Sequence, residues 1–213
     1  MASRKILTID KHEKILRTKS QPVKKITKDV KTLIKDIKDT IEDPDVPAMG
    51  LAAVQIGVLK RVFGAILGYD AEEDDGKMPP PTIFIDPELV EQAPEVERDF
   101  DACLSIPGMM GYTDRNIRIR VRYMDETGKK VEREFTGWDA RVILHEMDHL
   151  DGILFLDRLE SKADLFVYVK GKDGKTEPVP YLDIIAEAGQ STVEADRTPH
   201  SAHPAKRGPL KTV

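Results

Sequence analysis

The chain has 213 residues, 40% of them hydrophobic, and a formal net charge of −5 at neutral pH. This length suits one domain with a substantial core, and the acidic balance argues against general nucleic-acid binding. The only cysteine, Cys103, excludes an intrachain disulfide and fits a reducing compartment. No apolar run reaches transmembrane length and no signal peptide is evident at the amino terminus, so we expect no membrane contact.

The first half of the chain combines a helix with strands. Apolar residues at helical spacing predict an amphipathic helix over residues 26–41. Short apolar runs predict strands over residues 61–67 and 82–86. Between these strands, residues 68–81 are acidic and contain Gly and Pro, which predicts an exposed, mobile loop.

A strictly alternating segment follows at residues 117–123. One face is apolar and the other carries Arg118, Arg120 and Arg122. This period of two predicts a strand with one solvated face, which is a better interpretation of the arginines than a nucleic-acid or ribosome surface. A turn at residues 125–128 leads into a second strand.

The second helix is predicted over residues 140–150, with an apolar stripe toward the core and two histidines on an adjoining strip. A strand at 165–169 and a short helix at 180–188 complete a domain of residues 1–188. Residues 189–213 are polar and predict a disordered tail. The fold class is therefore α+β, a mostly antiparallel sheet packed around a central helix, with the amphipathic helix near the amino terminus.

The central helix carries the sequence HEMDH at residues 145–149. His145 and His149 lie one helical turn apart, so both rings can reach one metal ion, and Glu146 stands beside an open coordination position. Three protein ligands and a water molecule are typical of a catalytic metal site. The motif alone also fits two solvated histidines on a charged surface helix.

Two other segments make the pattern specific. Residues 50–57 read GLAAVQIG and residues 103–108 read CLSIPG. With the three motifs in this order, the chain resembles the peptide deformylase family over about residues 5–160.

The resemblance implies a role for seven residues. Cys103, His145 and His149 would bind the metal, and Glu146 would be the catalytic carboxylate. Gln55 and the Leu104 backbone N–H would stabilise the oxyanion, and the Gly50 carbonyl would accept the substrate N–H. Without the resemblance, Cys103 reads as a small buried hydrophobe and Gln55 as a surface amide.

The implied reaction is hydrolysis of the N-formyl group from the initiator methionine of new polypeptides, with release of formate. Thiolate ligation suits ferrous iron, which we expect as the physiological ion, with zinc, nickel or cobalt as substitutes. The implied partners are formyl-methionyl nascent peptides and, transiently, the ribosome, with no sequence-specific nucleic-acid binding. The expected location is the cytoplasm of a bacterium, with an organelle as the alternative.

Several positions depart from the family pattern. Ala48, Asp101, Ala102, Met110 and Leu144 stand where the family usually has Gly, Glu, Gly, Arg and Gln. None of these changes removes a ligand, but the change at Met110 predicts the loss of a contact to the peptide backbone. A divergent member that binds metal or formylated peptides without hydrolysis is therefore an alternative, as is a zinc endopeptidase. A purely structural metal site would require a fourth protein ligand.

Two further residues are open to two interpretations each. Asp148 either supports a metal ligand through a hydrogen bond or is a solvated helix carboxylate. Trp138, the only tryptophan, is favoured as a core residue over a residue that lines the substrate pocket.

Overall fold

A computed structural model describes residues 3–70, 77–171 and 174–188 of the chain. It confirms the α+β class, with antiparallel sheets arranged around a helix that carries the histidine pair. The predicted tail at residues 189–213 and the middle of the predicted loop at 68–81 lie outside the described residues.

The first sheet contains the predicted alternating strand and the strand that follows its turn. Its order is β1-β2-β3-β6-β7, and every neighbouring pair is antiparallel. The strands are β1 (Gly50–Ala52), β2 (Val62–Ala65), β3 (Thr82–Gln92), β6 (Arg118–Met124) and β7 (Lys130–Thr136). The predicted strands at 61–67 and 82–86 are thus confirmed, although β3 is longer than predicted.

A second sheet has the order β4-β5-β8-β9. Its strands are β4 (Val96–Ala102), β5 (Met109–Asn116), β8 (Leu165–Lys170) and β9 (Thr176–Pro180). Of these four strands only β8 was predicted. Strands β4 and β5 were missed because they are rich in charged and small side chains and lack an apolar alternation, and β9 was also missed. The expected single sheet is therefore divided into two.

Four α-helices are described: α1 (Ile9–Leu16), α2 (Lys28–Ile41), α3 (Gly137–Leu150) and α4 (Tyr181–Ala188). Short 3-10 turns cover Ala53–Ile56, Phe155–Arg158 and Lys162–Asp164. The predictions of α2, α3 and α4 are confirmed, whereas α1 was missed because it is short and mostly polar. No helix among the described residues is long and apolar enough to cross a membrane.

Helix α2 packs directly on the first sheet. The Thr27 side chain accepts the Val30 N–H and begins the helix, as expected for an N-cap threonine. At Gly64 in β2, an added Cβ would come within 3.0 Å of the Ile37 and Ile41 side chains. The glycine thus allows the close approach of helix and sheet that buries the apolar face of α2.

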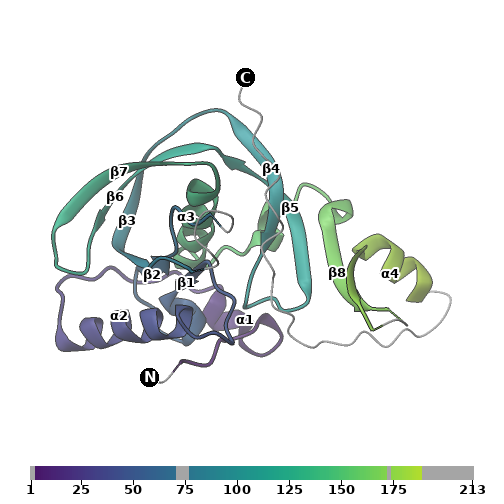
Figure 1. Ribbon diagram of the computed structural model, residues 1–213, viewed down its shortest axis with the longest axis horizontal. Helices are drawn as coiled ribbons and strands as arrows, with labels where there is room; N and C mark the ends of the chain where they lie inside the picture. Colours follow the sequence, from purple (N-terminus) through teal and green to yellow (C-terminus); the bar gives the residue numbers. More distant parts are fainter. Residues whose placement is uncertain (1–2, 71–76, 172–173, 189–213) are drawn as a thin grey trace.

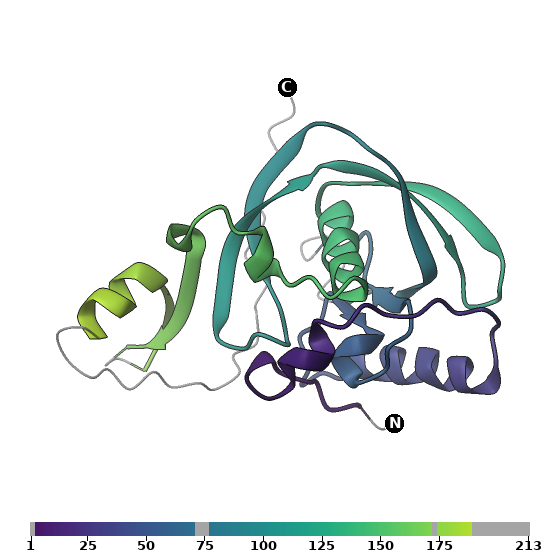
Figure 2. The same ribbon diagram turned by 180° about the vertical axis from the view of Figure 1, so that it is seen from behind.

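Helix α3 lies at the centre of the molecule, between the two sheets (Figures 1 and 2). Its Ala140, Ile143 and Leu150 side chains are fully buried against the first sheet. Toward the second sheet, the buried Arg141 guanidinium donates hydrogen bonds to the backbone carbonyls of Glu97 and Thr113. The helix is therefore held on both sides, which fixes the direction of its histidines.

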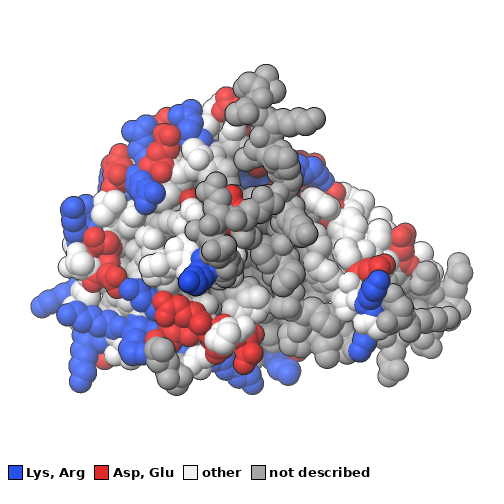
Figure 3. Space-filling view, viewed as in Figure 1, with Lys and Arg blue, Asp and Glu red and all other residues white. Residues whose placement is uncertain are grey.

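The arginine row on β6 faces solvent, as predicted. The Arg118, Arg120 and Arg122 side chains are about half exposed, and each pairs with glutamates on β3 or β7. Figure 3 shows the resulting mixture of positive and negative residues over this part of the surface. The row is a set of exposed ion pairs that cancel one another's charge.

Candidate metal centre and active site

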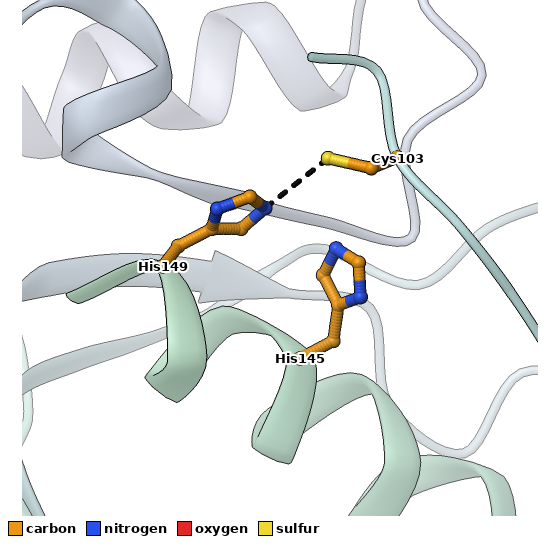
Figure 4. Close-up of side chains that lie close together, drawn as sticks. All are labelled: Cys103, His145 and His149. Atoms are coloured by element: carbon orange, nitrogen blue, oxygen red, sulfur yellow. Dashed lines mark hydrogen bonds between the residues drawn. The ribbon is translucent and has the colours of Figure 1, made fainter. Parts of the chain in front are cut away.

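Cys103, His145 and His149 converge on one point. Their ligand atoms all lie within 4.8 Å of one another, and the Cys103 Sγ is 3.2 Å from His149 Nε2. Figure 4 shows the two rings projecting from α3 while the sulfur faces them from the segment after β4. Among the described residues no fourth Cys, His or carboxylate joins this cluster, so a closed structural site is not formed.

The donor set fits a transition-metal ion. Two imidazoles and one thiolate are soft or borderline ligands that suit zinc and ferrous iron and disfavour magnesium or calcium. The rings meet edge to face, with centroids 4.9 Å apart, so both nitrogens can face one ion from the same side of α3. The residues present therefore match a three-ligand site with an open position.

Asp101 orients the first histidine ligand. His145 Nδ1 lies 2.6 Å from Asp101 Oδ1, and both side chains are buried. Burial opposes the charged ring, but the Asp101 carboxylate outweighs this effect and raises the pKa of His145 well above its ordinary value. A carboxylate on the outer nitrogen directs the other ring nitrogen to the metal and makes it a stronger donor.

Asp101 is itself held by a buried ion-pair network. Arg115 on β5 donates from Nε to Asp101 Oδ2 at 2.8 Å and from Nη1 to Asp148 Oδ2 at 3.0 Å. Arg158 also donates to Asp148, at 2.5 Å. Asp148 is buried, so its interpretation as a solvated carboxylate was wrong. The chain of contacts joins α3, β4 and β5 behind the metal ligands.

His149 has a different environment. Burial and the neighbouring His145 lower the pKa of His149 well below its ordinary value. Among the described residues its Nδ1 has no hydrogen-bond partner, while Nε2 faces Cys103. A neutral imidazole is the form that binds a metal, so this ring requires no deprotonation to act as a ligand.

Glu146 lies in the same cavity and is fully enclosed. Its residue exposure is 3%, and burial raises the pKa of its carboxyl to about 7. Its Oε2 is buried without a hydrogen-bond partner among the described residues. A carboxyl with a pKa near neutrality can both accept and return a proton.

Gly50 is the residue against which Glu146 lies. A Cβ added at Gly50 would come within 2.5 Å of Glu146 Oε1 and 2.8 Å of its Cδ. No side chain can therefore replace the hydrogen of Gly50 without displacing the carboxylate. Position 50 thus controls where Glu146 lies.

This contact gives a specific prediction. On the catalytic role that the resemblance implies for Glu146, Gly50→Ala is expected to lower kcat about 100-fold, because displacement of a catalytic group by about 1 Å has effects of this size. The measurement is steady-state kinetics with equal metal loading of both proteins. Gly128→Ala, in the turn between β6 and β7, is the control: its φ of +92° is unfavourable for alanine, but an added Cβ would meet only Ile26 Cδ1, at 3.5 Å, so this variant should lose stability and keep its kcat. Equal kcat for Gly50→Ala and the unaltered protein would contradict the prediction.

Gln55 is buried at 2% exposure, so its interpretation as a surface amide is wrong. It lies at the end of the 3-10 turn after β1, and its Oε1 accepts the Ala52 N–H at 2.8 Å. This bond fixes the amide orientation, so that Nε2 faces Cys103 Sγ at 3.6 Å and Ser105 Oγ at 3.2 Å. The Gln55 amide therefore directs its N–H groups toward Cys103, one of the metal ligands, and toward Ser105.

The cavity at this site has a volume of about 1150 Å³. Of the seven residues that the sequence selected, all except His149 line its wall, namely Gly50, Gln55, Cys103, Leu104, His145 and Glu146. Within the described part of the chain, the Leu104 N–H has no acceptor. Trp138 also lines the cavity and packs on Phe100 at 5.1 Å between ring centroids, so it is more than the core residue that was favoured.

The sequence analysis did not predict the buried charged residues that hold the metal ligands in place. Asp101 was considered only as a departure from a pattern, and Arg115 and Arg141 were not considered. The one available signal was the run of residues 109–116, in which Gly111, Thr113 and Arg115 recur at a period of two without forming an apolar face. Such a run can form a strand when its inward-facing side chains make hydrogen bonds to other buried polar groups.

Comparisons with known proteins agree with the geometry. The family model described as polypeptide deformylase matches residues 3–164. A peptide deformylase of Leptospira biflexa is 40% identical over 177 residues, which cover 79% of this chain and 93% of that protein. One from Pseudothermotoga lettingae is 40% identical over 147 residues, covering 69% and 78%.

Solved structures show the same fold. The crystal structure of peptide deformylase from Ehrlichia chaffeensis has a TM-score of 0.67 and 33% identity, and the match covers 75% of this chain and 89% of that one. The structure from Thermotoga maritima has a TM-score of 0.66 and 33% identity, with 76% and 100% covered. The family-model match, residues 3–164, contains all three motifs.

Proposed function

The chain belongs to the peptide deformylase family, and from this premise we propose that it hydrolyses the N-formyl group of formyl-methionyl peptides, releasing formate. The observation that carries the proposal is that a Cys-His-His metal site, a buried carboxylate and a fixed amide lie together at the wall of one cavity. These groups are the parts that metal-assisted amide hydrolysis requires.

We assign the proton transfers to Glu146. When bound, the metal ion supplies a Lewis acid that brings the pKa of water to about 7. The Glu146 carboxylate accepts the proton of the attacking water and then delivers it to the departing amine. Its raised pKa places both transfers near neutral pH.

We assign the stabilisation of negative charge to two N–H donors. Gln55 Nε2, which faces the ligands, and the Leu104 N–H, which has no acceptor among the described residues, would donate to the formyl oxygen as it becomes an oxyanion. The Gly50 carbonyl would accept the formamide N–H, since the absence of a side chain lets the substrate approach the backbone. These contacts would hold the formyl carbon beside Glu146.

We propose ferrous iron as the physiological ion, with zinc, nickel or cobalt as substitutes, on the basis of the thiolate and imidazole donors. The test combines metal analysis of anaerobically purified protein with an assay of formate release from a formyl-Met peptide. Formate release that is lost with a chelator and restored by Fe(II) is expected. Tight peptide binding with no release under any of the four metals would favour the non-hydrolytic alternative instead.

The pH profile follows from Glu146. Burial raises the pKa of this carboxyl to about 7, and only its ionised form accepts a proton. A bound cation favours the ionised form, so the midpoint in the loaded enzyme lies at or below pH 7. We expect kcat/KM to fall about tenfold per pH unit on the acid side of that midpoint. Rates measured from pH 4 to 9 check this, and activity that rises as pH falls would contradict it.

The proposed substrates also imply a cellular setting. Formylated chains emerge from ribosomes, so we propose transient ribosome contact in the cytoplasm, with an organellar matrix as the alternative. Cell fractionation distinguishes the two compartments. Co-sedimentation of the full chain with translating ribosomes at low salt is the expected result for contact, and its absence would argue against it.

A further inference from the structure

Tyr168 enters the cavity from a part of the fold beyond the family match. The match ends at residue 164, whereas Tyr168 lies on β8, which follows it. Strand β8 pairs with the edge of β5, and Figures 1 and 2 show β8 and α4 extending from that side of the molecule. Strand β8 lies between β5 and β9 and brings one side chain, Tyr168, to the cavity wall.

The Tyr168 hydroxyl has a weak partner. It donates to the Met110 thioether Sδ at 3.2 Å, while the Tyr168 backbone N–H donates to the Gly108 carbonyl at 2.9 Å. The backbone bond fixes the residue, but a thioether sulfur is a poor acceptor. Burial raises the pKa of the phenol, so it keeps its proton at neutral pH. The cavity wall therefore presents an anchored donor that loses little when it turns to a carbonyl oxygen.

The position of Tyr168 separates it from the chemical step. Gly108, to which it bonds, ends the CLSIPG segment, while Cys103, the metal ligand, begins it. Among the described residues Tyr168 has no hydrogen bond to a metal ligand or to Glu146. Tyr168 therefore lines the cavity without a hydrogen bond to the groups assigned to formyl hydrolysis, which leaves its hydroxyl available to another part of a substrate.

We propose that Tyr168 is a substrate-binding residue that donates its hydroxyl to a backbone carbonyl of the formylated peptide after the first residue. This inference rests on the proposed deformylase function and adds to it a residue that contacts the peptide beyond its formyl-methionine. The side chain of the peptide residue does not matter to such a contact, because the acceptor belongs to the backbone. The contact thus suits an enzyme that acts on many nascent chains.

The test measures kcat and KM with formyl-Met, formyl-Met-Ala and formyl-Met-Ala-Ala. Tyr168→Phe keeps the ring and removes only the hydroxyl. Its KM is expected to rise about two- to tenfold for the tripeptide, the range for one neutral hydrogen bond, with kcat little changed. The shortest substrate that shows the rise identifies the carbonyl involved.

Met110→Leu separates substrate binding from a structural role. This change conserves volume and removes the sulfur, leaving the hydroxyl without its internal acceptor. If Tyr168 binds substrate, the tripeptide KM of Met110→Leu stays equal or falls. If the Tyr168–Met110 contact only holds β8 to β5, both variants raise KM together, and the inference is wrong.

A matched control and a separate readout complete the design. Tyr112 is exposed on β5, packs edge-on against Phe166 and does not line the cavity, so Tyr112→Phe is expected to leave every KM unchanged. An unchanged tripeptide KM in Tyr168→Phe would also overturn the inference. Failure of the proposed function looks different, because the unaltered, metal-loaded protein would then release no formate from any of the three peptides.

Discussion

Glu146→Gln is expected to lower kcat by about 10²- to 10⁴-fold, the usual contribution of a general acid-base group. The amide has nearly the shape of the carboxyl and fits against Gly50, but it can neither accept nor return a proton. The loss should therefore appear in kcat, with KM for a formyl-Met peptide changed much less. Formate release under anaerobic, iron-loaded conditions is the measurement.

Two controls keep this result specific. The metal content of Glu146→Gln should equal that of the unaltered protein, because Glu146 is not one of the three ligands. Glu13→Gln removes an exposed helical carboxylate that pairs with Arg17, and its kcat should not change. Full activity in Glu146→Gln at equal metal content would exclude the proposed proton transfers.

Replacement of Arg115 should produce the largest loss of stability. Arg115 is 6% exposed and neutralises two buried carboxylates, Asp101 and Asp148. Arg115→Met leaves both acids buried without this cation, and removal of one partner from a buried ion pair costs about 3–5 kcal/mol. Denaturant unfolding of the metal-free protein measures the change in the free energy of unfolding. Because Asp101 also orients His145, metal affinity is expected to fall about 10- to 100-fold.

Arg122→Met is the matched control. Arg122 also bridges two carboxylates, at 3.1 Å to Glu88 and 2.9 Å to Glu132, but its side chain is 48% exposed. Exposed pairs contribute at most about 1 kcal/mol, so this variant should lose little stability and no metal affinity. Equal losses in the two variants would show that burial of the Arg115 network does not matter.

The histidine motif could be interpreted from the sequence because the positions of its residues depend only on the local geometry of one helix. His145, Glu146 and His149 are placed by the period of one helix, and helical spacing alone brings the rings to one face. The apolar periodicities of α2 and β6 are equally local, and both elements are confirmed at nearly the predicted bounds. Cys103 and Gln55 required the resemblance, since they lie 42 and 90 residues before His145 and nothing in their spacing joins them to it.

The buried ion-pair network behind the metal ligands joins residues that are far apart in the chain, and the sequence did not reveal it. Asp101, Arg115 and Asp148 lie on three elements and read separately as ordinary charged residues. Only the pairing of β4 with β5 and their packing around α3 bring them within hydrogen-bond distance. The same holds for Tyr168, whose place at the cavity follows from β8 adding to β5.

The sequence by itself therefore determined the fold class, the central helix and the metal ligands with their neighbouring carboxylate. Local periodicity and ordered motifs are sufficient for these features. The tertiary structure alone decided that the strands form two sheets, that Gly50 positions Glu146, and that a buried ion-pair network holds His145. These features depend on contacts between residues far apart in the chain, whose distances and burial arise only when the sheets close around α3.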